Sequence, residues 1–439
     1  MTKAARSSDA LLALTVLTLA YLIAYCDRVI VMILVGQFKR DLGFTDSQIA
    51  LLIGFSFAVF YAVACLPLGR LADRVNRRNL IMAGIVSWSA ATAACGLFTE
   101  FTGLFIARVC VGVGEACLLP AALSMLADLF GPRTRSKAIA MFICGAPLGS
   151  GLAYLLGGSL LHRVETGAIS PLMTFTEFPW QSIFAVLGLL GLLIAAALML
   201  VDEPRRQFDA RAANDRVEGQ SLIGLLRGNG ALIVGIVLGP SIISMAFYAL
   251  LSWGPTMMVR RFDWTAQDIA LWFTPLGVAS GLAGPWIGAL TGSFLVRTWK
   301  RSDGLMLGAV CLAIAACPLA LTAVTITNAG MAVVLMFTAT SILIAAQTLP
   351  QIAIQYVIPG DSRGQFTAMF VFGTNVIGFG LGPSIVAALT DHVFHEGGNL
   401  HISLAIVCIS AVTIGALVTL TRLSAYRLQA AMLAPEQRN

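Results

Sequence analysis

Residues 304–360 read GLMLGAVCLAIAACPLALTAVTITNAGMAVVLMFTATSILIAAQTLPQIAIQYVIPG and contain no charged side chain. A helix needs about 20 consecutive apolar residues to cross a bilayer. The 57 residues of this stretch are too many for one such helix and enough for two, with a turn at TITNAG, residues 325–330. The stretch therefore predicts a pair of membrane-spanning helices.

The composition of the whole chain supports the same conclusion. Of its 439 residues, 58% are hydrophobic and 11% are charged, whereas about 25% of residues are charged in a soluble globular protein. Strand-type alternation, which would indicate a membrane barrel, is absent. Together with the pair above, the following apolar runs predict an all-α integral membrane fold of twelve transmembrane helices: 11–26, 49–69, 80–99, 101–129, 138–161, 178–201, 228–259, 269–296, 365–390 and 400–421.

Basic residues are distributed unevenly between the two ends of these helices. Of the 28 Lys and Arg residues, 21 fall on the side that holds both termini, five fall on the other side and two lie inside spans. Because cytoplasmic loops hold the excess of Lys and Arg, we expect both termini in the cytoplasm. We expect a multi-pass protein of the plasma membrane, which in a bacterium is the inner membrane. The basic residues are spread over many loops, so they do not predict nucleic acid binding.

One long polar stretch divides the chain near its middle. It reads DEPRRQFDARAANDRVE, residues 202–218, and separates six predicted spans from six. We therefore expect three parts, namely an N-terminal six-helix bundle at 1–201, a cytoplasmic linker at 202–221 and a C-terminal six-helix bundle at 222–439.

The two halves share a short motif. RSKAIAMFICG at 135–145 recurs as RGQFTAMFVFG at 363–373, in the pattern R-x-x-x-x-A-M-F-x-x-G. Internal repeats of this kind are typical of secondary transporters, whose substrate sites lie between the repeats near the bilayer midplane. Motifs for ATP binding, serine hydrolysis and zinc hydrolysis are missing. We therefore expect neither an enzyme nor a bound cofactor. The nine cysteines lie in apolar segments without a CxxC pair, so we expect no metal role for them.

Four charged residues lie inside the predicted spans, namely Asp27, Arg28, Arg108 and Glu115. Each would cost about 2.5 to 3.5 kcal/mol alone at the centre of a membrane helix, and their charges sum to zero. Arg108 and Glu115 are seven residues apart and share one helix face, with Gly112 between them leaving room for another group. Span one and span four run in opposite directions, so we expect Asp27 and Arg108 to lie at similar depth and to meet.

Two interpretations of these four charges remain open. They form an ion-pair cluster that fixes helix packing, or they line a transport pathway, which is the usual role of charges in a membrane. In the second case Arg108, together with Arg28, holds a phosphate or carboxylate, because arginine stays protonated. Asp27 and Glu115 exchange protons, because burial and a nearby arginine favour opposite protonation states. Substrate arriving at Arg108 would weaken its attraction for both acids.

The second half contributes milder polar groups. Gln347, Gln351 and Gln355 lie four apart on one face of span ten, where they either face the cavity or hold helices together. Tyr248 lies in span seven beside several serines, whose hydroxyls we expect to bond to the local backbone. We count Gln347, Gln351 and Tyr248 among the substrate-binding candidates.

Three motifs resemble the major facilitator superfamily. GRLADRVNRR at 69–78 resembles its signature loop between spans two and three, and ARVCVGVGEACLLPAALSMLADLF at 107–130 resembles its fourth span. YCDR at 25–28 combined with RVCVGVGEA at 108–116 resembles the Spinster branch, whose members transport lysophospholipids or sphingosine phosphate. The loop has Asn76 where the family has Gly, and its second-half copy lacks the expected acid and base.

This resemblance implies a cytoplasmic gate. Gly69 would let span two approach span eleven, and Asp73 would face the N-terminus of span eleven near Arg363. Asp128 would pair with the arginines of the loop, which are Arg74, Arg77 and Arg78. Positive-inside charge alone explains the arginines but not the acids. In span five, Pro147, Gly149 and Gly151 indicate either a hinge or close packing.

We therefore expect a monomeric, proton-coupled transporter of an amphiphilic anion that works by alternating access. Its partners would be a lipid-like substrate, protons and membrane lipids. A multidrug or small organic-anion transporter is the alternative within the same class. A passive lipid scramblase or a non-transporting membrane receptor is the alternative from another class.

Overall fold

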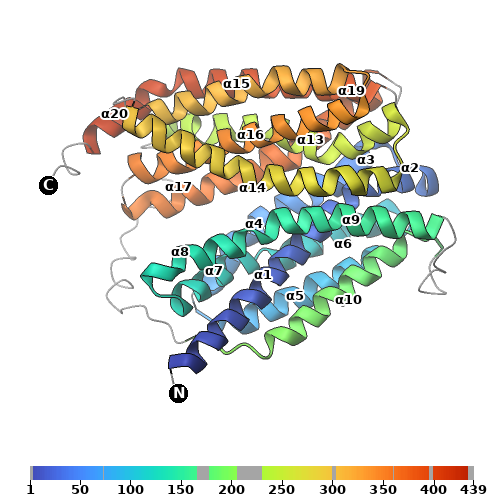
Figure 1. Ribbon diagram of the computed structural model, residues 1–439, viewed down its shortest axis with the longest axis horizontal. Helices are drawn as coiled ribbons and strands as arrows, with labels where there is room; N and C mark the ends of the chain where they lie inside the picture. Colours follow the sequence, from blue (N-terminus) through green and yellow to red (C-terminus); the bar gives the residue numbers. More distant parts are fainter. Residues whose placement is uncertain are drawn as a thin grey trace. The chain divides into compact units, whose positions relative to one another are not determined.

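The computed structural model describes residues 3–72, 74–165, 177–204, 230–298, 303–358, 360–394 and 399–433. Every regular element in these ranges is helical (Figure 1). Asp73 and residues 205–221 of the predicted linker lie outside them. The all-α architecture predicted from the apolar runs is therefore confirmed.

The structure divides into two compact units. The first comprises Met1–Gln207 together with Pro255–Ala279, and the second comprises Phe208–Gly254 together with Ser280–Asn439. Two of the boundaries fall inside long helices, namely α13 (Gly239–Phe262) and α14 (Ala266–Thr298). The division into six-helix bundles around a linker at 202–221 stays a prediction.

Most of the first unit is a run of helices that follow the predicted spans. In chain order they are α1 (Lys3–Ile33), α2 (Val35–Leu42), α3 (Asp46–Ala50), η1 (Leu51–Phe55), α4 (Ser56–Ala72), α5 (Arg77–Cys95), α6 (Phe101–Glu115), α7 (Leu118–Leu129), α8 (Pro132–Ile143), α9 (Gly145–Glu165) and α10 (Gln181–Leu198). Predicted span four is divided into α6 and α7, and span five into α8 and α9.

The second half of the chain repeats this pattern. Its helices are η3 (Val234–Leu238), α13 (Gly239–Phe262), α14 (Ala266–Thr298), α15 (Gly304–Thr325), α16 (Ala329–Val357), α17 (Gly360–Gly373), η4 (Thr374–Leu381), α18 (Gly382–His392), α19 (Leu400–Thr421) and α20 (Leu423–Leu433). The uncharged stretch at 304–360 forms α15 and α16, which pack against each other. The predicted turn between them is confirmed by the break between Thr325 and Ala329.

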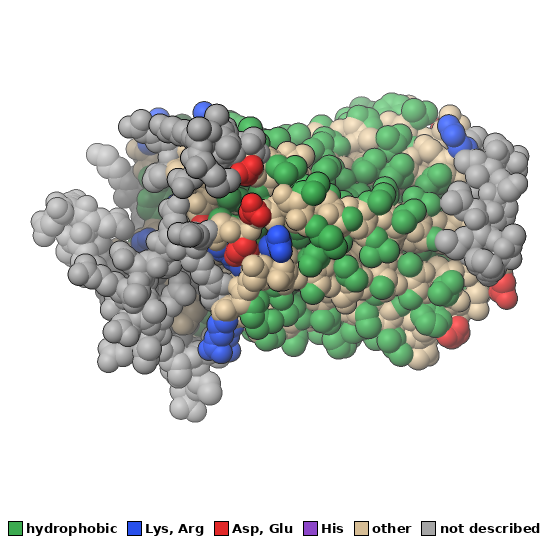
Figure 2. All heavy atoms as spheres, turned by 90° about the horizontal axis from the view of Figure 1, so that it is seen from below, with side chains coloured by type: hydrophobic (Ala, Val, Ile, Leu, Met, Phe, Trp, Pro, Cys, Tyr) green, Lys and Arg blue, Asp and Glu red, His purple; other side chains and the backbone are tan. Residues whose placement is uncertain are grey.

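Eleven helical stretches in the described residues are long and apolar enough to cross a membrane. The face drawn in Figure 2 shows a broad band of hydrophobic side chains, with charged side chains gathered toward its two ends. Helix α5, at the place of the predicted third span, is not among the eleven. It begins with Arg77 and Arg78 and contains Ser87, Ser89 and Thr92, so it is the least apolar of the predicted spans.

Glycines bring α9 into close contact with α1. A β-carbon added at Gly145 would lie 2.9 Å from the carbonyl oxygen of Thr18, and one added at Gly149 would lie 3.0 Å from Cβ of Tyr25. The carbonyl oxygen of Gly151 accepts a hydrogen bond from Thr274 Oγ1 at 3.2 Å. These contacts support close packing as the role of the glycines in span five.

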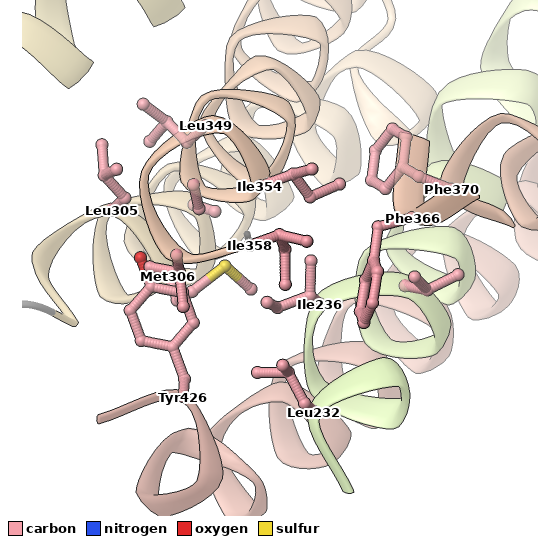
Figure 3. Packing of buried hydrophobic residues seen from close by; sticks show 14 of the residues in the cluster. Leu232, Ile236, Leu305, Met306, Leu349, Ile354, Ile358, Phe366, Phe370 and Tyr426 are labelled. Atoms are coloured by element: carbon pink, nitrogen blue, oxygen red, sulfur yellow. The ribbon is translucent and has the colours of Figure 1, made fainter. Parts of the chain in front are cut away.

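A hydrophobic cluster holds one end of the second unit together. Figure 3 shows Leu232 and Ile236 facing Ile354, Ile358 and residues of neighbouring helices, among them Leu305, Met306, Leu349, Phe366, Phe370 and Tyr426. The members come from η3 and the helical residues directly before it, from α14, α15, α16, α17 and α20, and from Ile358 directly after α16. Because the cluster joins η3 and α20 to the consecutive helices α14 to α17, its burial fixes the packing of segments that are distant in sequence.

The repeated motif has the same local structure in both units. Arg135 donates from Nε to the carbonyl oxygen of Phe130 at 3.4 Å, and Arg363 donates from Nε to the carbonyl oxygen of Ile358 at 2.8 Å. Phe130 ends α7 and Ile358 ends α16, both with extended backbone. The arginine therefore binds a carbonyl left free at a helix end in each copy, which supports the interpretation of the two motifs as an internal repeat.

A second pair of equivalent contacts has its charges reversed. In the first unit Arg77, at the start of α5, donates from Nε to Glu203 Oε1 at 2.8 Å. In the second unit Asp303, before the first residue of α15, accepts from Nε of Arg427 at 2.6 Å. Each contact joins the start of the third predicted span of its half to the segment after the sixth.

Substituting Gly149 with Ala should destabilise the first unit, because the added methyl group would overlap the backbone of Leu22 in α1. Overpacking of this kind typically costs about 1 to 3 kcal/mol. We expect a lower Tm in detergent for Gly149→Ala. The matched control is Gly36→Ala in α2, where an added β-carbon meets nothing within 4 Å. Equal Tm values for the two variants would contradict close packing at Gly149.

Candidate functional site

Helices α1 and α6 bring the four intramembrane charges together in the first unit. Arg28 donates from Nε to Glu115 Oε2 at 2.7 Å, and its Nη2 lies at the same distance from that oxygen. Asp27 Oδ1 lies 3.5 Å from Nη1 of Arg108. The expected meeting of Asp27 and Arg108 is therefore confirmed. The shorter pair, however, is the one between Arg28 and Glu115.

Asp27 has a second partner that the sequence analysis did not identify. The hydroxyl of Thr92 in α5 donates to Asp27 Oδ2. The two carboxylate oxygens of Asp27 thus have different partners on different helices, α6 and α5. Hydrogen bonds of this kind stabilise the charged form of a buried acid and fix its orientation. Asp27 therefore ties three helices of the first unit together.

Aromatic rings surround the guanidinium of Arg28. Its Cζ lies 4.6 Å from the ring centroids of Tyr25 and Phe57, and 4.7 Å from that of Tyr61. Cation–π contacts of this geometry stabilise a charge away from water. Two of the three rings come from α4, so α4 contributes to the site although it has no charged residue at this level.

The position of Gly112 between Arg108 and Glu115 predicted room for another group. The structure shows no such room. A β-carbon there would lie 2.8 Å from the carbonyl oxygen of Phe57 and 3.3 Å from its Cα. The space beside the glycine is thus occupied by the backbone of α4. This close approach brings the ring of Phe57 to 5.5 Å from Cζ of Arg108. The prediction was wrong because it could not include the opposing helix.

The four charges differ in their access to the surface. The side chains of Asp27 and Arg108 are each 2% exposed and that of Glu115 is 0% exposed, whereas that of Arg28 is 11% exposed. Among the described residues, Nε and Nη2 of Arg108 and Oε1 of Glu115 have no hydrogen-bond partner. A buried polar group without a partner costs about 1 to 3 kcal/mol. The site thus retains unused donors and an unused acceptor next to its ion pairs.

A second charged cluster lies where the signature loop was predicted. Arg77 donates to Asp128 Oδ2 at 2.6 Å and to Ser124 Oγ at 2.9 Å, in addition to its contact with Glu203. The pairing of Asp128 with a loop arginine is therefore confirmed. Asn76 begins the helix by accepting from the backbone N–H of Asn79 at 2.8 Å, with φ of −63°. Its backbone does not need the glycine that the family has here.

The remaining loop residues have separate surroundings. The backbone N–H of Arg78 donates to Glu203 Oε2 at 2.9 Å, and Arg74 is exposed. At Gly69 an added β-carbon would lie 3.9 Å from Pro120, an ordinary packing distance. Asp73 lies outside the described residues, so its contact with span eleven near Arg363 stays a prediction.

The polar residues of the second unit lie mainly in contacts between and within helices. Gln347 donates from Nε2 to the carbonyl oxygen of Pro240 at 2.8 Å, which joins α16 to α13. Gln351 is exposed, and Tyr248 lies with its ring centroid 5.0 Å from that of Phe379. Ser241 and Ser244 donate to local carbonyls, as predicted. These contacts favour a helix-packing role for Gln347 and leave Gln351 and Tyr248 as candidates.

Glu203 and the aromatic group around Arg28 were not identified from the sequence. Glu203 lies at the start of a run of mixed charges, in which one acid gives no distinct signal. Tyr25 stands three residues before Arg28, which is a helical neighbour spacing, but such pairs are common. In the described part of the chain, no group of three or more His, Cys, Asp or Glu side chains is arranged to hold a metal ion.

Comparison with known proteins agrees with this architecture. The protein is 29% identical to an MFS-type efflux pump of Mycolicibacterium smegmatis over 91% of this chain and 89% of that protein. It is 27% identical to Protein spinster of Drosophila melanogaster over 66% of this chain and 47% of that one. It is 25% identical to the sphingosine-1-phosphate transporter SPNS2 of Xenopus tropicalis over 86% and 73%.

Solved structures show the same fold. A bacterial homolog of the human lysosomal transporter Spinster, in an inward-facing and unoccupied conformation, superposes with a TM-score of 0.77 over 98% of both chains at 22% identity. These similarities support the Spinster-like character inferred from YCDR and RVCVGVGEA. The family model of the Major Facilitator Superfamily matches residues 17–383. The chain therefore belongs to the major facilitator superfamily and is a multi-pass membrane transporter of the secondary type, not an enzyme.

Proposed function

We propose that this transporter moves an amphiphilic anion, such as a lysophospholipid or a sphingoid phosphate, in exchange with or together with protons. The observation that carries the proposal is the Arg28–Glu115 pair, in which a partly exposed cation is bound to a fully buried acid. An anionic group is able to reach Arg28 first, because the other three charges are more deeply buried.

The pair suggests how binding and protonation are linked. A phosphate or carboxylate that binds Arg28 competes with Glu115 for the same guanidinium. Glu115 would then be a buried carboxylate without its cation, which is costly unless it takes up a proton. Substrate binding and proton uptake are therefore coupled by charge balance. The sequence suggested Arg108 as the first anion site, and the exposure of Arg28 favours Arg28 instead.

Asp27 and Arg108 form the second ion pair of the proposed mechanism. Their pair is looser, at 3.5 Å, and Arg108 keeps two nitrogens without a partner among the described residues. An oxygen of the substrate that comes within reach of Arg108 would satisfy these donors. Loss of its attraction for Asp27 would leave Thr92 as the remaining partner of the acid. Asp27 is thus the second proposed proton site.

The relatives support the substrate class without identifying the substrate. SPNS2 of Xenopus tropicalis is named as a transporter of sphingosine-1-phosphate. Sphingosine-1-phosphate is an amphiphilic anion. The efflux pump of Mycolicibacterium smegmatis has the higher identity and favours a multidrug or small organic-anion transporter as the second candidate. We also propose that both termini lie in the cytoplasm. The inner gate proposed from the signature loop comprises Gly69, Asp73, Arg74, Arg77, Arg78, Asp128 and Arg363.

Purified protein in liposomes that contain a pH-sensitive dye distinguishes these candidates. We expect lysophospholipids and sphingoid phosphates, added outside, to change the lumenal pH. A response to cationic drugs alone would contradict the lipid proposal and favour the multidrug transporter. Movement of lipid with no pH response would indicate a passive scramblase, and binding without movement would indicate a receptor.

Glu115→Gln should remove the coupling to protons, because an amide of the same shape cannot exchange a proton. We expect the substrate-driven pH change in the liposome assay to fall to that of protein-free liposomes. Glu100→Gln is the matched control, since Glu100 is an exposed acid next to the first residue of the same helix, α6. Full proton-dependent transport by the Glu115 variant would refute the role of this acid.

Substituting Arg28 should weaken anion binding. Arg28→Gln alone leaves Glu115 buried without a cation, which typically costs about 3 to 5 kcal/mol of stability. The double variant R28Q/E115Q avoids this cost because both charges are removed together. We expect the double variant to keep its Tm, and its substrate Kd to rise by about tenfold or more. Arg163→Gln, at an exposed arginine of α9, should leave Kd unchanged. An unchanged Kd in the double variant would show that the anion binds elsewhere.

A further inference from the structure

The first unit contains a cavity of about 530 Å³, and none of the four intramembrane charges is among the residues that line it. It is lined by the end of α1, by α2, by Leu161 of α9 and by residues between Pro255 in α13 and Ile269 in α14. Sites for small organic ligands typically measure about 300 to 1,000 Å³. The positive-inside distribution predicts that this end of the unit faces away from the cytoplasm. The proposed mechanism does not use this cavity.

Three cations line the cavity, namely Lys39, Arg40 and Arg260. Two carboxylates oppose them. Asp46, whose side chain is fully buried, accepts from Nη1 and Nη2 of Arg260 at 2.7 and 2.6 Å and from Nζ of Lys39 at 2.9 Å. Asp41 accepts from Nε of Arg40 at 2.9 Å, in an exposed pair that contributes little stability. These acids hold the three cations in place, and no Asp or Glu is itself among the described residues that line the cavity.

The rest of the wall is apolar. Ile33, Leu161, Val259 and Ile269 line the cavity, together with the indole of Trp264. A basic rim beside an apolar wall is complementary to a molecule that has an anionic head and a hydrocarbon chain. A small inorganic anion would not contact the apolar wall, and an uncharged hydrocarbon would not use the basic rim.

We propose that this cavity is a second binding site for an anionic amphiphile, with its phosphate or carboxylate on Arg40, Lys39 and Arg260 and its chain along Leu161, Val259 and Trp264. The inference rests on the proposed substrate class but places a ligand at a site outside the four charges. The same chemistry is available from the transported molecule and from an anionic phospholipid of the bilayer.

Occupancy would have a conformational effect. The cavity exists only where Arg260 and its neighbours in α13 and α14 lie against α2 and the end of α1, because its wall comes from both segments. A ligand that binds one arrangement shifts the population toward it. An anionic amphiphile bound here therefore favours the arrangement in which Pro255–Ile269 lies against α2 and the end of α1.

Quenching of Trp264 fluorescence tests the proposal directly. The probe is a lysophospholipid with a net negative head and a brominated chain, added to purified protein, and Trp264→Phe defines the contribution of this indole. We expect saturable quenching by the anionic probe and weaker quenching by a brominated zwitterionic lysophospholipid. Equal quenching by the two probes would overturn the proposal.

Two kinds of variant locate the binding. Gly36 lines the cavity and an added β-carbon there meets nothing within 4 Å, so Gly36→Leu should fill the space and abolish quenching. Arg40→Gln removes a side chain that is 62% exposed, and should weaken binding by about tenfold without unfolding the protein. Arg261→Gln is the matched control, because Arg261 adjoins Arg260 but does not line the cavity. Unchanged quenching in Gly36→Leu and Arg40→Gln would refute the site.

Two further experiments identify the source of the ligand and distinguish this proposed site from the proposed coupling mechanism. Quenching in nanodiscs by a brominated diacyl anionic phospholipid would assign the site to bilayer lipid, and quenching by the single-chain probe alone would assign it to the transported molecule. Quenching by neither anionic form would overturn the proposal. In the Glu115→Gln background the substrate-driven pH change should be lost while quenching persists. Failure of the coupling mechanism and failure of this site therefore give different results.

Discussion

Four charged side chains that sum to zero lie in the apolar interior of the first unit, and the pairing among them fixes the packing of the surrounding helices. Arg28 and Glu115 join α1 to α6, and Asp27 joins α1 to α6 and α5. Removal of a single member would leave a buried charge unpaired, which is far more costly than removal of a complete pair. The rotation of each helix about its axis is therefore restricted by charge pairing as well as by packing.

The two ion pairs of this site differ in how tightly they are held. Arg28 holds Glu115 on two nitrogens, while Arg108 and Asp27 are held more loosely. The unused donors of Arg108 and the unused oxygen of Glu115 are next to these pairs. In the proposed mechanism, a tight pair beside a loose one lets a new anion exchange partners with the existing acids, so that no unpaired charge is left in the apolar interior.

Much of this organisation could be predicted from the sequence, for physical reasons that are visible in particular residues. Uncharged runs such as 304–360 are expected to form membrane-spanning helices, because a helix satisfies its own backbone hydrogen bonds in a bilayer. The opposite directions of spans one and four place Asp27 beside Arg108. The preference of Arg28 for Glu115 could not be predicted, because adjacent residues point about 100° apart on a helix and the sequence does not give the rotation. The role of Gly112 depends on Phe57, which lies on another helix. Glu203 was hidden among mixed charges, and its importance depends on where the chain returns after α10.

The reversed polarity of the two equivalent ion pairs has a consequence for assembly. Arg77 binds Glu203 in one repeat, and Asp303 binds Arg427 in the other. If a segment after the sixth helix docked on the third helix of the wrong repeat, Arg77 would meet Arg427 and Asp303 would meet Glu203. Like charges in such contacts oppose the exchange. The opposite arrangement of charge in the two repeats therefore disfavours docking of either segment on the wrong repeat during folding.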